Sequence, residues 1–140
     1  MITGIDLNQY INKIIYIKTI NGLYLSIEDV SETNYAPTFV FVTDKIRASE
    51  FVLSKKSDTN VSIRLNIDMK NQNNTFGYHL YILPDSDIVF GAGNDEIFAQ
   101  FQLDHYNQYI LIKSAYKNTY LCSEYNILRN RPRNDTTTSF

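Results

Sequence analysis

The sequence predicts an all-β fold, and three observations carry that prediction. Short β-rich runs joined by polar breaks recur along the chain, most clearly in residues 15–28 and 109–124. No helical periodicity is sustained over more than two turns. Asn, Asp, Gly and Ser interrupt the chain about every ten residues, which is typical of tight turns between strands.

Two stretches share most of their pattern and are expected to form hairpins. Aligned on Lys18 and Lys113, each has Ile before the Lys, a hydroxyl residue after it, a polar break, then Tyr-Leu and a Glu. This order indicates a strand, a tight turn and a second strand. A weaker third copy joins residues 61–65 to residues 77–83 across a long polar insertion.

Each expected hairpin is followed by another apolar run and then by a closing Phe. The closing residues are Phe51, Phe101 and Phe140, each with a small residue two places before it. The result is a unit of four short strands repeated three times at a period of roughly 40 to 50 residues. We expect one domain over residues 1–140, with repeats at about 10–56, 57–105 and 106–140.

This threefold pattern resembles the β-trefoil superfamily, in which a six-stranded barrel is capped by three hairpins. The resemblance implies a β-trefoil of three four-stranded repeats with a repeated apolar set on its axis. An all-β domain whose strands look alike for general reasons is the alternative. The expected axial residues are Ile17, Leu25, Phe51, Ile63, Leu80, Phe101, Ile112, Leu121 and Phe140.

The motifs of three families within that superfamily can be compared with this sequence. Residues 77–128 resemble the fibroblast growth factors, with Gly-Tyr-His-Leu-x-Ile-Leu-Pro-Asp at 77–85 and Ile-Lys-Ser and Tyr-Leu-Cys later. Ser86 replaces their turn glycine, and a final basic repeat is missing. The closing Phe residues resemble the fascin and hisactophilin group of actin-binding proteins. The Gln-x-Trp closure of ricin-type lectins is absent.

Composition narrows the classes of function. Apolar residues make up 44% of the chain, which argues against disorder. A formal charge of -2, with 13 basic against 15 acidic residues, predicts no nucleic-acid binding. The single cysteine, Cys122, excludes an internal disulfide. We see no transmembrane segment and no signal peptide, so the sequence predicts either a cytoplasmic protein or secretion by a non-classical route.

Two clusters are candidate sites for a ligand, in addition to one aromatic residue, Tyr35, in a polar loop. The first lies at 104–109, where Tyr106 is suited to stack on a sugar face with Asp104 and Asn107 beside it. As an alternative, its tyrosines simply cap the fold.

The second candidate cluster consists of Arg129, Arg131 and Arg133. Their alternation would place all three on one face of an extended segment, which suits a sulfate, a phosphate or an acidic partner. The alternative is a row of cations that protects an exposed strand edge from aggregation.

Catalysis, metal binding and cofactor binding find no support in the sequence. Neither His79 nor His105 stands in a motif with a nucleophile or an acid. Cys122 follows a core Leu, so we expect a small buried hydrophobe. His and Cys are too few and too scattered for a metal site.

We therefore expect a non-enzymatic, lectin-like recognition module that binds glycan or protein surfaces through its loops. Such a module fits an accessory subunit of a larger secreted or toxin-associated assembly, and so a hetero-complex. The two alternatives are a cytosolic actin-binding or scaffolding protein and a growth-factor-like receptor ligand.

Overall fold

The computed structural model describes residues 9–28, 38–66, 79–82, 89–92 and 97–140 of the 140-residue chain. This part of the chain consists of β-strands and two short 3-10 helices. The elements are β1 (Ile14–Ile15), β2 (Tyr24–Glu28), β3 (Thr38–Val42), η2 (Lys45–Arg47), β4 (Phe51–Lys55), β5 (Val61–Leu65), β6 (His79–Ile82), β7 (Val89–Ala92), η3 (Ile97–Ala99), β8 (Gln100–Tyr106), β9 (Tyr109–Ser114), β10 (Tyr120–Glu124) and β11 (Ile127–Arg131).

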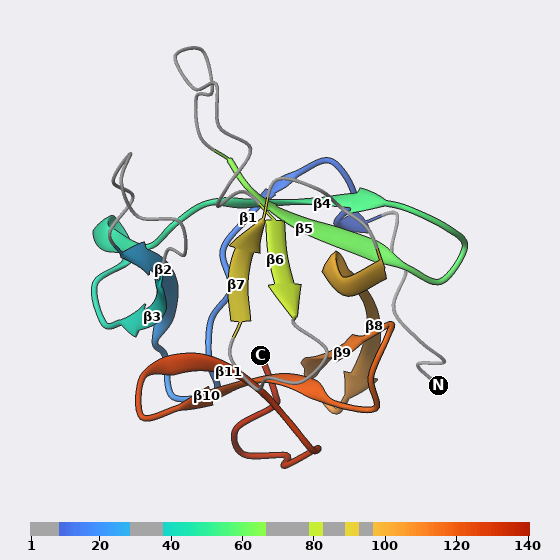
Figure 1. Cartoon of the computed structure of the whole chain (residues 1–140). Coiled ribbons are helices and arrows are strands. Elements are labelled where there is room, and N and C mark those ends of the chain that lie inside the picture. Colours follow the sequence, from blue (N-terminus) through green and yellow to red (C-terminus); the bar gives the residue numbers. More distant parts are fainter. Residues whose placement is uncertain (1–8, 29–37, 67–78, 83–88, 93–96) are drawn as a thin grey trace.

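The strands form one antiparallel sheet that curls into a half barrel. Its main path has the order β1-β4-β5-β8-β9-β10-β11-β3-β2, and the β6–β7 hairpin branches from β5. In Figure 1 this path runs from β4 and β5 at the top, through β8 and β9, to β10 and β11 at the bottom, with β2 and β3 at the left.

The prediction of a β-trefoil of three four-stranded repeats is therefore wrong, although the all-β class is observed. The strands join edge to edge into one path with two ends, β1 and β2. The expected third repeat contributes the strands β9, β10 and β11, and in place of a fourth strand it has an isolated bridge between Ser139 and Leu111. The resemblances to fascin, hisactophilin and fibroblast growth factors depended on the trefoil fold, so they are not supported either.

The two hairpins expected from the aligned stretches are present, although they do not belong to a trefoil. Lys18 bridges Tyr24, and Tyr120 pairs with Lys113, so both aligned stretches fold back on themselves. The first turn needs Gly22, whose φ of 88° lies in the left-handed region. Its N–H donates to the carbonyl of Thr19 at 3.0 Å.

The core lies inside the curl of the sheet and matches the residues expected there. All the predicted axial residues are buried except Phe140, which is partly buried, packs on the same core and stacks on Phe41 at 6.0 Å. Burial of each large apolar side chain contributes about 1.5 to 3 kcal/mol. These side chains fix which face of each strand points inward, because neighbours in a strand alternate between faces.

A bulky residue occupies a strained position in the β10–β11 turn. Tyr125 and Asn126 have φ values of 52° and 61°, as in a type I′ turn, and Tyr125 is 91% exposed. Asn tolerates this conformation, whereas tyrosine does so at a cost. We expect Tyr125→Asn to raise the free energy of unfolding by about 0.5 to 1 kcal/mol, measured by urea denaturation. A decrease would show that the tyrosine ring makes a stabilising contact.

Candidate functional site

Two of the expected ligand-binding residues meet on the outer face of the sheet. Tyr106 ends β8, and the guanidinium carbon of Arg133 lies 5.1 Å from the centre of its ring. Tyr106 is partly buried and Arg133 is exposed. An arginine at this distance from an aromatic ring makes a cation–π contact, which holds the ring in one orientation.

The C-terminal segment brings Arg133 to this place. Pro132 has no N–H to donate to a strand, and β11 ends just before it, at Arg131. The chain then turns through Asn134, whose carbonyl accepts hydrogen bonds from the backbone N–H and the hydroxyl of Thr138, each at 2.7 Å. Phe140 finally pairs with Ile110 of β9 through two backbone hydrogen bonds of 2.8 and 3.0 Å.

Acidic partners neutralise two of the three expected arginines. Arg133 donates from Nε to Asp135 at 2.8 Å, and this hydrogen bond raises the pKa of the guanidinium above its ordinary value. Arg131 donates from Nε and from a terminal nitrogen to both oxygens of Glu124, at 3.2 and 3.3 Å. A paired guanidinium orients hydroxyl groups well but attracts a free anion less strongly.

The other expected site residues have different surroundings. Asp104 is exposed on the same face of β8 as Tyr106, and one of its oxygens accepts the His105 N–H at 2.8 Å. Asn107 is exposed in the β8–β9 turn with a φ of 54°. Arg129 is half-buried on β11, and Tyr35 lies outside the described residues.

A second aromatic and cationic cluster was not expected from the sequence. It consists of Tyr16, Lys18, Tyr24 and Lys45, which come from the β1–β2 segment and from η2. The alternation of Tyr16 with Lys18, facing the Tyr-Leu of the same hairpin, was the signal available for three of them. Nothing in the sequence indicates that Lys45 joins them.

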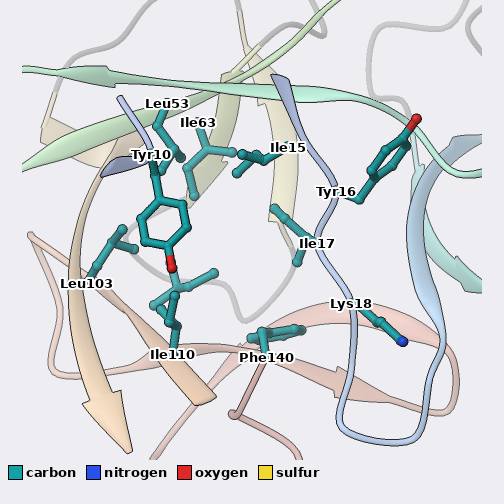
Figure 2. Close-up of a pocket in the computed structure, with 11 residues that line it drawn as sticks. Tyr10, Ile15, Tyr16, Ile17, Lys18, Leu53, Ile63, Leu103, Ile110 and Phe140 are labelled. Carbon is teal, nitrogen blue, oxygen red and sulfur yellow. The ribbon is translucent and has the colours of Figure 1, made fainter. Parts of the chain in front are cut away.

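Beside this second cluster, the curl of the sheet leaves a cavity of about 240 Å³. Figure 2 shows Ile15 and Ile17 pointing into it, whereas Tyr16 and Lys18 of the same segment point away. The other lining side chains are apolar except for the Tyr10 hydroxyl. A cavity with one polar group offers little to orient a polar ligand, so the candidate site is placed on the surface.

Among the described residues, the thiol of Cys122 is not set up to react, and no cluster of metal ligands is found. Cys122 is buried, as expected, and burial together with the Glu124 carboxylate raises the pKa of its thiol from 9.0 to about 11. Within residues 9–28, 38–66, 79–82, 89–92 and 97–140, no three His, Cys, Asp or Glu residues cluster in a way that would hold a metal ion. No described helix is long and apolar enough to cross a membrane.

Comparison with known proteins shows a fold likeness without a sequence family. No protein-family model matches the chain, and no curated protein matches it in sequence. A salivary protein of Culex quiquefasciatus, from the cysteine and tryptophan-rich family, matches with a TM-score of 0.70 and 16% identity. This match covers 91% of the chain and 90% of the Culex protein.

Two further structures resemble the chain over part of their own length. Lysenin, in its complex with phosphocholine, matches with a TM-score of 0.64 and 15% identity over 90% of the chain and 42% of lysenin. A Polyporus squamosus lectin, bound to an epitope that contains sialic acid, matches with a TM-score of 0.66 and 14% identity. That match covers 92% of the chain and 47% of the lectin. The chain thus shares its curled β-sheet fold with less than half of each of these two proteins.

Proposed function

We propose that the protein is a non-enzymatic binding module that recognises glycans on a cell or protein surface. The observation that carries the proposal is the contact between Tyr106 and Arg133, with Asp135 fixing the guanidinium. A ring, a guanidinium and a carboxylate held together are the groups that contact the apolar face and the hydroxyls of a sugar. Asp104 adds a second carboxylate on the same face of β8.

The similar structures support this proposal at the level of the fold. One of them is bound to a sialic acid epitope and another to phosphocholine. Both ligands present polar head groups of the kind found on cell surfaces. Because the chain spans under half of lysenin and of the lectin, we further propose that it works as the recognition part of a larger, toxin-like assembly. Function depends on the surface groups and not on the fold, so these groups are the ones to test.

The first experiment is a glycan array followed by titration calorimetry with the best neutral glycan. We expect Tyr106→Ala to weaken binding by about tenfold, because a stacked aromatic contact contributes about 0.5 to 1.5 kcal/mol beyond its buried area. Tyr106→Phe keeps the ring and should bind like the unmodified chain. Binding to a neutral glycan should also resist added salt.

Tyr125→Ala is the control, since Tyr125 is an exposed tyrosine of the β10–β11 turn, whereas Tyr106 ends β8. Equal losses in Tyr106→Ala and Tyr125→Ala would mean that the Tyr106 surface has no special role. A blank array, with neutral, sialylated and sulfated glycans all unbound, would reject glycan recognition altogether.

A further inference from the structure

We propose that Tyr16, Lys18, Tyr24 and Lys45 form a second binding site, which takes the sulfate groups of a sulfated saccharide. This site goes beyond the proposed function, because it uses other residues and holds whether or not Tyr106 binds a sugar. We call these four residues the lysine–tyrosine cluster.

The four side chains contact one another in the order Lys18, Tyr24, Tyr16 and Lys45. The Lys18 ammonium lies 5.5 Å from the centre of the Tyr24 ring, and the Lys45 ammonium lies 5.0 Å from that of Tyr16. The two rings meet edge to face, with centres 6.4 Å apart and planes at 82°. Each lysine is thus held over a ring, which restricts a side chain that is otherwise flexible.

The positive charges of this cluster are available to a ligand. Lys18 and Lys45 are exposed, and neither has a carboxylate partner among the side chains that the structure describes. Asp44, next to Lys45 in the chain, accepts a hydrogen bond from the Ile46 N–H at 2.9 Å and so caps η2. Arg131 and Arg133, by contrast, are already paired with acids.

The cluster stands on an ordered part of the fold. Lys18 bridges Tyr24 across the first hairpin, so these two residues share one face of it. η2 is tied to β2 because the Ser26 hydroxyl donates to the Arg47 carbonyl at 2.8 Å. The Ser49 hydroxyl accepts the Ile27 N–H at 2.9 Å and makes a second link. Lys45 is therefore brought to the hairpin by hydrogen bonds and is partly organised before a ligand binds.

An acidic sugar fits these groups better than a membrane surface does. A lysine contributes only about a fivefold gain toward an anionic membrane, and the chain as a whole carries a formal charge of -2. Two tyrosine rings at a steep angle offer a corner where one sugar ring packs on a ring face. An ammonium group beside that ring then meets a sulfate of the same saccharide, and the ammonium group at the other end of the cluster meets a second sulfate.

The test is a calorimetric titration with a heparin-derived tetrasaccharide and with the same tetrasaccharide after removal of its sulfates. We expect only the sulfated form to bind, and we expect added salt to weaken it. Lys18→Ala and Lys45→Ala should each weaken binding by about tenfold, as expected for lost hydrogen bonds to a charged group. Tyr16→Ala should also weaken it, whereas Tyr16→Phe should not.

Three controls show whether binding depends on the lysine–tyrosine cluster itself. Lys56→Ala, which removes a charge from the β4–β5 turn, should leave the affinity unchanged. Tyr106→Ala should also leave it unchanged, which separates this site from the one under the proposed function. Thermal melting of every variant checks that the fold is intact.

Three results would overturn the proposal. They are equal binding of the two tetrasaccharides, no binding of the sulfated one, or an equal effect of Lys56→Ala and Lys18→Ala. A fourth would replace it with a membrane surface: lysine-dependent binding to vesicles of phosphatidylserine and phosphatidylcholine, with the tetrasaccharide unbound.

Discussion

Phe101→Ala is expected to lower the free energy of unfolding by about 3 to 5 kcal/mol. Phe101 has no exposed surface, and its strand β8 pairs here with Val61 of β5 on one side and Ser114 of β9 on the other, so its ring projects from the middle of the sheet into the core. Removing it deletes a large apolar group and leaves a void that a closely packed surrounding fills only in part. Urea denaturation followed by circular dichroism measures the change in midpoint.

The matched control for this prediction is Ile46→Ala, which removes an apolar side chain that is 91% exposed on η2. It should change the free energy of unfolding by no more than about 0.5 kcal/mol. Because a domain of this size is stable by only about 5 to 15 kcal/mol, Phe101→Leu serves as a milder second variant. Similar effects of Phe101→Ala and Ile46→Ala would show that the core is not where the structure places it.

The buried thiol of Cys122 is expected to lower the free energy of unfolding at alkaline pH. Burial, with a smaller contribution from Glu124, raises the pKa of the folded thiol to about 11. Below about pH 8 the thiol is protonated in both states and contributes no pH dependence. Between about pH 8 and 11 it ionises mainly in the unfolded chain, so stability falls as pH rises, by up to about 2 kcal/mol.

Cys122→Ala isolates this contribution, because the two proteins differ only in the thiol group. The difference in unfolding free energy between the two proteins should be constant up to about pH 8 and should shrink toward pH 11. A constant difference across the whole range would mean that the thiol ionises as readily in the folded chain. As a direct check, a thiol reagent at pH 8 should label the native protein far more slowly than the unfolded one.

The hairpins and the core were predictable from the sequence because they depend on local order. The Tyr-Leu pairs, the polar breaks and the closing Phe residues specify which runs extend and which side chains turn inward. How the hairpins join was not predictable, because the pairing of Ile127 with Val40 or of Ile14 with Val52 links residues far apart in sequence. Repetition in the sequence suggested three separate units of four strands, the middle one weaker, whereas the strands continue from one unit into the next as a single sheet.

The candidate site was predictable only in part, for a related reason. The alternation of the three arginines predicted that they share one face of an extended strand. Such alternation applies only within a strand, and Arg133 lies beyond the end of β11 at Arg131. Its contact with Tyr106 follows from the return of the C-terminal segment to β9. The ion pair between Arg131 and Glu124 joins neighbouring strands, so it also could not be predicted from the number of charged residues.

The cavity beside Ile15 and Ile17 also has a mechanical consequence. Unfolding eliminates such a void, so the total volume of protein and water decreases when the chain unfolds. Hydrostatic pressure therefore favours the unfolded state, and more strongly than in a chain of equal stability without the void. The cavity lies against β1, a strand of two residues at one end of the main path of the sheet, so we expect β1 to be among the first strands to separate under pressure.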